Sequence, residues 1–110
     1  GIDVLRGGLG KDTLTGGADR DFFIFTNTVQ NCTSLSQLDF GHDVVTDFQR
    51  GLDLLTFEGG LSGLLTNFND ITSRLTEVNG NAVITFSSQA SITIVGVHAN
   101  QLTASDFNVV

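Results

Sequence analysis

Aspartate residues recur at a spacing of nine at the start of the chain, each close to glycines. They are Asp3, Asp12 and Asp21. Carboxylate oxygens and the carbonyl oxygens of glycine turns are the ligands of a hard cation, and no nitrogen or sulfur donor recurs with them. The flexible geometry of turn carbonyls favours Ca²⁺ over Mg²⁺. The spacing therefore predicts oxygen-lined calcium sites between successive turns.

A nine-residue unit surrounds each of these aspartates. The unit at 7–15 is complete, and it lies between the end of one unit at 1–6 and a third unit at 16–24. Its glycines permit positive φ and a tight turn, and its last three residues alternate as a very short strand does. Two units then form one coil of 18 residues, so every second turn stacks on the same side. A flexible Gly-rich linker, the alternative, gives no reason for the strict period.

Composition excludes several partners. The chain of 110 residues has a formal net charge of −7, with 12 acidic and 5 basic residues, and its Lys and Arg do not cluster. Nucleic acid and anionic membrane surfaces need clustered cations, so we expect neither as a partner. The single cysteine, Cys32, cannot form an internal disulfide, and no apolar run approaches the about 20 residues of a membrane span. The absence of Met indicates a fragment or a processed piece.

The unit at 7–15 resembles the RTX (repeats-in-toxin) nonapeptide, Gly-Gly-x-Gly-x-Asp-x-apolar-x, at every fixed position. The third unit departs once, with Asp19 at the fourth position, although Asp tolerates a left-handed backbone better than most residues. Residues 43–55 resemble the segment that follows the last repeat in serralysin-type RTX proteins, and residues 102–110 resemble their C-terminus.

The resemblance implies a C-terminal module of a larger protein that bacteria secrete through a type I ABC transporter. It implies an uncleaved secretion signal at the end of the chain, formed by Asp106, Phe107, Asn108, Val109 and Val110. It also implies Ca²⁺ as the cofactor and an extracellular location.

The resemblance further implies how the calcium ligands divide. One ion would lie between the first and third turns, held by the carbonyls of Gly1, Gly16 and Ala18 and the carboxylates of Asp3 and Asp21. A second would use the carbonyls of Gly17 and Asp19 with the carboxylate of Asp21, closed by Asp43 or by Asp39. The turn with Gly7, Leu9 and Asp12 would face an upstream coil and form a half-site.

The expected fold class is all-β: a short parallel β-roll capped by an antiparallel, β-rich C-terminal region with one short helix. We expect the end of the roll at 1–25, a polar loop at 26–42 and the cap at 43–110. Within the cap, strands are expected at 43–48 and 52–57, a helix within 65–75, and a meander of strands at 75–78, 81–86 and 91–97. Asn79-Gly80 is a strong signal for a type I′ hairpin, and a last strand at 107–109 would close the sheet.

No catalytic signature is evident, so we do not expect an enzyme. His42 and His98 are isolated, with no His at i+4 of either, and Cys32 has no evident base. The parent protein could be a hydrolase, a protease, an epimerase or a toxin. The leading hypothesis is a module that folds when it binds Ca²⁺ outside the cell and loses ordered structure in a chelator. The alternative is a module that binds an alginate-like polysaccharide through bound Ca²⁺ or through a basic strip of Arg6, Lys11 and Arg20.

Overall fold

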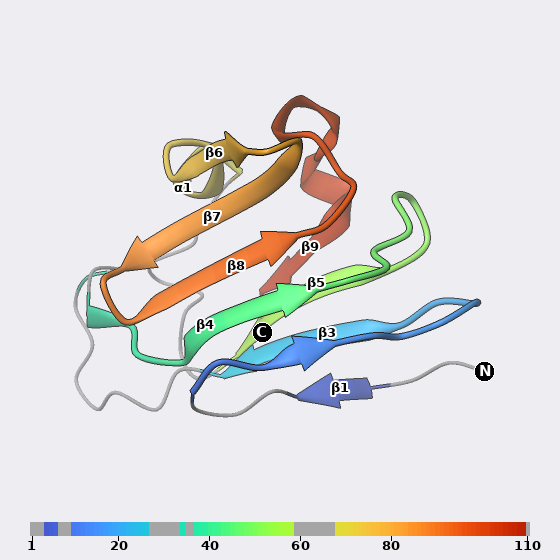
Figure 1. Ribbon diagram of the computed structural model, residues 1–110, viewed down its shortest axis with the longest axis horizontal. Helices are drawn as coiled ribbons and strands as arrows, with labels where there is room; N and C mark the ends of the chain where they lie inside the picture. The colour runs from blue at the N-terminus through green and yellow to red at the C-terminus, as the bar shows by residue number, and fades with distance from the viewer. Residues whose placement is uncertain (1–3, 7–9, 27–33, 35–36, 59–67, 110) are drawn as a thin grey trace.

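Two β-sheets pack face to face, and the chain passes repeatedly from one to the other (Figure 1). The computed structural model describes residues 4–6, 10–26, 34, 37–58 and 68–109. Sheet A contains four strands in the order β1-β3-β5-β9, and sheet B contains five in the order β2-β4-β8-β7-β6. The strands of sheet A are β1 (Val4–Arg6), β3 (Phe22–Thr26), β5 (Leu54–Glu58) and β9 (Phe107–Val109). Those of sheet B are β2 (Thr13–Leu14), β4 (Gly41–Val45), β6 (Leu75–Val78), β7 (Asn81–Ser87) and β8 (Ala90–Ile94).

The coil length expected from the nonapeptide is confirmed. β1 pairs in parallel with β3, and Val4 lies opposite Phe22, which is a separation of 18 residues along the chain. The apolar eighth position of the repeat points into the space between the sheets, where Leu14 is 8% exposed and Phe23 is fully buried. Two nine-residue units therefore make one coil, because turn and short strand alternate between the sheets.

Parallel pairing continues well beyond the repeats. β5 pairs in parallel with β3 and with β9, while β4 pairs in parallel with β2 and with β8. The antiparallel pairing expected throughout the C-terminal region is confined to β6, β7 and β8. The expected strands at 43–48 and 52–57 correspond to β4 and β5, which lie in opposite sheets. The all-β class with a parallel roll and one short helix is confirmed.

The hairpin at Asn79-Gly80 is confirmed. Both residues have positive φ, 53° and 81°, as a type I′ turn requires, and Val78 lies opposite Asn81 across the turn. The helix is shorter than expected: α1 (Asn69–Thr72) is followed almost at once by β6, and residues 65–67 lie outside the described part of the chain. Two 3₁₀ turns, Ala99–Gln101 and Ala104–Asp106, lead into β9.

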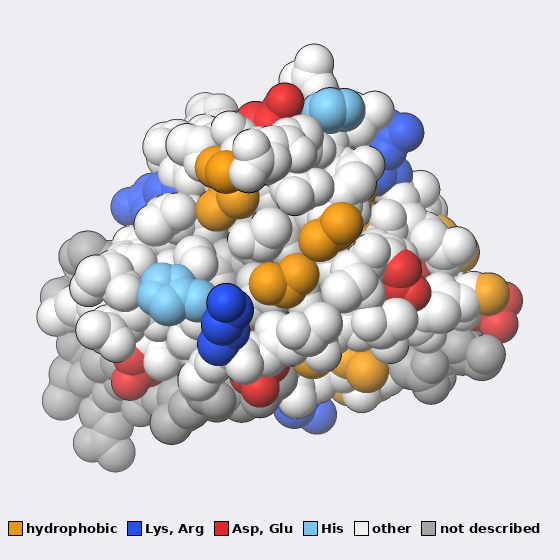
Figure 2. Space-filling model, viewed as in Figure 1, with side chains coloured by type: hydrophobic (Ala, Val, Ile, Leu, Met, Phe, Trp, Pro, Cys, Tyr) orange, Lys and Arg blue, Asp and Glu red, His pale blue; other side chains and the backbone are white. Residues whose placement is uncertain are grey.

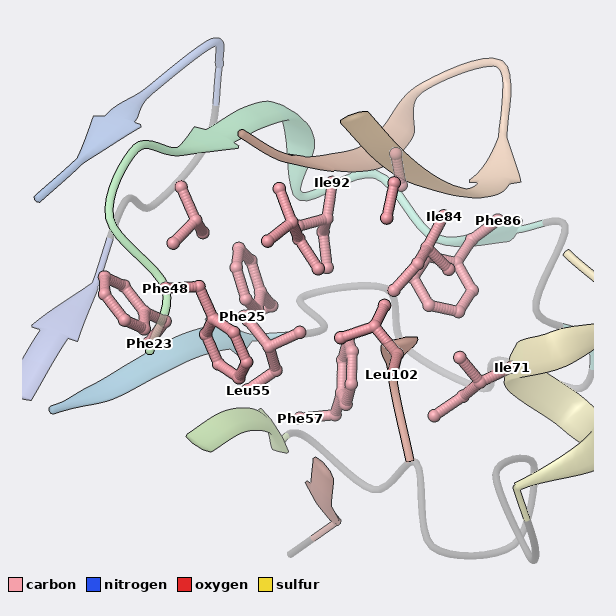
Figure 3. Packing of buried hydrophobic residues seen from close by; sticks show 14 of the residues in the cluster. Phe23, Phe25, Phe48, Leu55, Phe57, Ile71, Ile84, Phe86, Ile92 and Leu102 are labelled. Carbon is pink, nitrogen blue, oxygen red and sulfur yellow. The ribbon is translucent and has the colours of Figure 1, made fainter. Parts of the chain in front are cut away.

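The core lies between the sheets and is rich in phenylalanine (Figure 3). Phe57 is fully buried, and its ring centroid lies 5.7 Å from that of Phe25, 5.6 Å from that of Phe86 and 6.3 Å from that of Phe107. Ile71 of α1 is also buried in this cluster, so the short helix closes one end of the core. Nonpolar burial on this scale is the main force that keeps the two sheets together.

No helix in the described part of the chain is both long enough and apolar enough to cross a membrane.

Candidate metal site

A left-handed residue stands two positions before an aspartate in four turns of the roll. Those residues are Gly10, Asp19, Gly41 and Gly51, with φ of 93°, 70°, 96° and 79°. The aspartates that follow them are Asp12, Asp21, Asp43 and Asp53, and each directly precedes or lies within a strand of the parallel stack. The four turns share this left-handed position before the aspartate, and the last two lack the leading Gly-Gly of the repeat.

Asp43 lies on Asp12 because β4 stacks on β2. The backbone N–H of Asp12 donates a 3.0 Å hydrogen bond to Oδ1 of Asp43. Oδ2 of Asp12 is buried and has no hydrogen-bond partner. Burial raises the pKa of Asp43 to about 6; the bond from the Asp12 backbone opposes this shift, and the neighbouring Asp12 carboxylate adds to it. Two carboxylates thus meet between coils, and the nearby Asp12 side chain makes ionisation of Asp43 less favourable.

The turns on this side of the roll are in close contact. A Cβ added at Gly41 would lie 1.8 Å from the carbonyl oxygen of Gly10. Only glycine lets the second turn approach the first so closely, and Gly10 and Gly41 each lie two residues before one of the aspartates that meet. Backbone oxygen and carboxylate oxygen together are the donor set of a hard cation.

Asp21 lies within its own glycine turn and beside Asp53. A Cβ added at Gly16 would lie 2.3 Å from Oδ2 of Asp21, so the carboxylate packs directly on the turn that the sequence assigned to it. The N–H of Asp21 donates a 2.8 Å bond to Oδ1 of Asp53. Burial also raises the pKa of Asp53, while bonds from the backbone of Gln49 and Asp21 oppose the shift.

The structure brings some of the expected ligands together and separates others. Gly16, Gly17, Ala18, Asp19 and Asp21 form one turn, as expected. Asp43 does not lie beside Asp21 as expected: β4 belongs to sheet B and β3 to sheet A, so Asp43 meets Asp12 instead. Asp39 is exposed and precedes the buried Phe40. Gly1, Asp3, Gly7 and Leu9 lie outside the described residues.

Three further acids accept hydrogen bonds from the main chain. Asp47 and Asp53 are not among the expected ligands, and Asp106 is expected only in the secretion signal. Asp47 accepts bonds from the N–H groups of Gly16 and Gly17, and Asp53 accepts bonds from Asp21 and Gln49. Asp106, expected in the secretion signal, accepts bonds from Gly51 and Thr103. The shortened pattern Gly-x-Asp-x-apolar, present at 41–45 and 51–55, is the signal that would have revealed Asp53 as a repeat aspartate.

Of the residues expected to form the secretion signal, Phe107–Val109 form β9 of sheet A, and Asp106 ends the 3₁₀ turn before it. Asp106 is 2% exposed, Phe107 stacks on Phe57, and β9 pairs with β5. Asn108 is exposed on β9, and Val109 ends that strand. Val110 lies outside the described residues.

The two histidines have structural partners. His42 contacts Ser91 through Nδ1 at 2.7 Å and the carbonyl of Ser88 through Nε2 at 2.9 Å, so it joins β4 to the β7–β8 turn. His98 lies 3.2 Å from Glu77. Within the described residues, no three side chains of His, Cys, Asp or Glu gather as a metal site. A cation at Asp12 and Asp43 would therefore take its remaining ligands from backbone carbonyls.

The fold and these turns define a parallel β-roll whose coils meet through acidic side chains. Among solved structures, the chain is similar to the extracellular lipase LipA from Serratia marcescens, at 24% identity and a TM-score of 0.62. The match covers 98% of this chain and 19% of that lipase, so the chain spans about a fifth of its length. At this identity the likeness shows the fold alone, and that fold is the one the RTX resemblance implies. No family model and no curated protein matches the sequence.

Proposed function

We propose that the chain is a calcium-binding β-roll module of a larger secreted protein, and that Ca²⁺ completes its fold outside the cell. The observation that carries this proposal is the pair of acids Asp12 and Asp43. They meet between two stacked turns, and one buried carboxylate oxygen of Asp12 lacks a hydrogen-bond partner. Two adjacent carboxylates in a buried place repel each other unless a proton or a cation neutralises them.

Two ions fit this arrangement. One would lie between Asp12 and Asp43, with carbonyl oxygens such as that of Gly10 completing its coordination. The half-site assigned to Gly7, Leu9 and Asp12 would thus be closed by Asp43. The other would lie between Asp3 and Asp21 with the carbonyls of Gly1, Gly16 and Ala18. The register of β1 on β3 supports the second assignment, because Asp3 and Asp21 immediately precede the paired residues Val4 and Phe22.

Calcium would link folding to location. Cytosolic free Ca²⁺ is far below the about 10⁻⁴–10⁻³ M at which extracellular modules bind it, so the acidic turns would repel one another inside the producing cell. Outside, binding would supply folding free energy. A type I secretion signal at 106–110 is part of this proposal, as is attachment to a larger extracellular protein whose activity belongs to its other domains. The fold shared with part of an extracellular lipase supports such a modular arrangement.

Calorimetric titration of the 110-residue chain with CaCl₂, after treatment with EGTA, tests the proposal. We expect saturable binding of Ca²⁺, far weaker binding of Mg²⁺, and a gain in β-sheet circular dichroism as Ca²⁺ is added. Asp12→Asn should weaken the binding, whereas Asp70→Asn, which removes one charge from α1, should not. A chain with no heat of binding and a spectrum indifferent to EGTA would refute the proposal.

The polysaccharide alternative gains no support from the placement of the cations. Arg6 pairs with Glu58 through two bonds of 3.2 and 3.3 Å. Lys11 precedes β2 of sheet B, whereas Arg20 precedes β3 of sheet A, so they belong to turns on opposite sides of the coil. On the face shown in Figure 2, Lys and Arg side chains are dispersed rather than gathered in a strip.

A further inference from the structure

Three aspartates of the roll have both carboxylate oxygens bonded to backbone N–H groups. Oδ1 and Oδ2 of Asp47 accept from Gly16, at 2.9 Å, and from Gly17. Asp53 accepts from Asp21 at 2.8 Å and from Gln49 at 2.9 Å. Asp106 accepts from Gly51 at 3.3 Å and from Thr103 at 2.8 Å. Both oxygens of each carboxylate thus accept main-chain hydrogen bonds.

Each of these aspartates joins one coil to the coil before it. Asp47 follows β4 and bonds to the turn after β2, which is the neighbour of β4 in sheet B. Asp53 precedes β5 and bonds to the residue before β3, its neighbour in sheet A. Asp106 precedes β9 and bonds to the turn before β5. The direction is constant: the later coil supplies the carboxylate, and the earlier coil supplies the N–H.

The donor set at these three positions is the reverse of what a cation needs. N–H groups around a carboxylate offset part of its charge with their positive dipole ends, as in a main-chain anion nest, and Gly17 has the positive φ, 84°, that one residue of such a nest adopts. A cation placed there would face those same dipole ends. At Asp12, by contrast, Oδ2 is buried without a donor, so the two kinds of contact differ in chemistry.

We propose that Asp47, Asp53 and Asp106 are metal-independent clamps that keep the coils from β3 to β9 stacked when calcium is absent. Calcium would then be needed only to hold the turns that precede β2 and β1 against this clamped part, through Asp12 with Asp43 and through Asp3 with Asp21. Removal of calcium loosens only this N-terminal part of the roll, and the clamped coils remain as the surface on which it coils again. This goes beyond the proposed function, which does not say where calcium dependence ends.

Amide hydrogen exchange, resolved by residue with NMR on the 110-residue chain, tests the clamps. In EGTA, the N–H groups of Gly16, Asp21 and Gly51 should exchange at least about 100-fold more slowly than in an unfolded peptide. Addition of millimolar CaCl₂ should slow the N–H of Asp12 but change these three little. If all three exchange at the unfolded rate in EGTA and become slow only with CaCl₂, the clamps need metal and the proposal is overturned.

Substitutions separate a clamp from a calcium ligand. Asp53→Asn keeps one oxygen but turns an amide NH₂ toward either Gln49 or Asp21, so the Asp21 N–H should exchange at least about 10-fold faster in EGTA. Its affinity for CaCl₂ should stay within a factor of about three of wild type. Asp12→Asn should lower the affinity for CaCl₂ and leave the exchange of the Asp21 N–H in EGTA unchanged. Asp70→Asn, the control for lost charge, should change neither the exchange rate nor the affinity. If Asp53→Asn does not fold, Asp47→Asn read at Gly16 replaces it.

The outcomes also distinguish this proposal from the proposed function. Slow exchange of the three amides in EGTA together with no response to CaCl₂ anywhere would sustain the clamps and refute calcium binding. A large loss of calcium affinity in both Asp47→Asn and Asp53→Asn would identify those residues as ligands and refute the clamps.

Discussion

Oδ1 of Asp43 accepts a 3.0 Å hydrogen bond from the backbone N–H of Asp12, and the two side chains meet at a buried gap between coils. Burial raises the pKa of Asp43 from 3.8 to about 6. The folded state therefore holds the proton more tightly than the unfolded chain does. In EGTA, this residue should lower the free energy of unfolding by about 3 kcal/mol as the pH rises from about 4 to about 6. Asp53, whose pKa burial also raises, acts with the same sign.

Urea unfolding at several pH values, compared between wild type and Asp43→Asn, isolates the contribution of Asp43. The variant should lack that part of the decline because its amide does not titrate. Calcium should counteract the decline, since a bound cation favours the ionised form of Asp43. Identical pH profiles for the two proteins in EGTA would contradict the assignment.

Asp12→Asn should have opposite effects on the metal-free and the calcium-bound protein. Without calcium at pH 7, removal of one of two adjacent charges should raise the free energy of unfolding by about 1–2 kcal/mol. With calcium, the loss of one ligand should reduce affinity at least about 10-fold. Denaturant curves in EGTA and calorimetric titration measure the two effects. A variant that is less stable than wild type in EGTA would show that the Asp12 charge is already compensated there.

Gly41→Ala should destabilise the roll strongly. Gly41 has a φ of 96°, and an added Cβ would lie 1.8 Å from the carbonyl oxygen of Gly10. The backbone strain of alanine at this φ and the steric overlap with the Gly10 backbone would therefore both destabilise the variant. We expect a loss of about 3 kcal/mol or more in thermal or urea unfolding. Gly51→Ala is the matched control, because Gly51 has a φ of 79° with open space around its Cβ position, and it should lose only about 1 kcal/mol. Equal losses in both variants would mean that the close approach of the turns contributes nothing.

Phe57→Ala should cost about 3–5 kcal/mol of unfolding free energy, because the ring is fully buried among three other phenylalanines. Val95→Ala removes a side chain that is 40% exposed and should change stability by less than about 0.5 kcal/mol. Differential scanning calorimetry at fixed calcium compares the two. A small loss of stability in Phe57→Ala would mean that the packing of β5 against β7 contributes little to the free energy of unfolding.

Local patterns in the sequence predicted the features that depend on neighbouring residues. The nonapeptide gave the 18-residue coil seen in the pairing of Val4 with Phe22, and Asn79-Gly80 gave the hairpin. The left-handed backbone of Asp19 also agrees with its place in the repeat. These features follow from turn chemistry within a few residues.

Features that depend on pairing between strands far apart in the sequence are harder to predict from the sequence. β4 lies on β2 across 31 residues, as in the pairing of Thr13 with Val44, because residues 27–40 interrupt the period. Because residues 41–45 lack the leading glycines, the repeat there is hard to recognise, and the sequence alone pairs Asp43 with Asp21 rather than with Asp12. The parallel position of β9 beside β5 depends on the stack already formed, which no short window of sequence encodes.

The antiparallel hairpin β6–β7 has a consequence for association between molecules. A stack of parallel coils has two ends, and exposed strand edges at both would allow head-to-tail growth into filaments. In sheet B the outer edge of β8 is already taken by β7, whose direction is opposite to that of the coils. A second molecule therefore cannot pair with β8, and an added strand would meet β6 instead, a short edge strand of four residues.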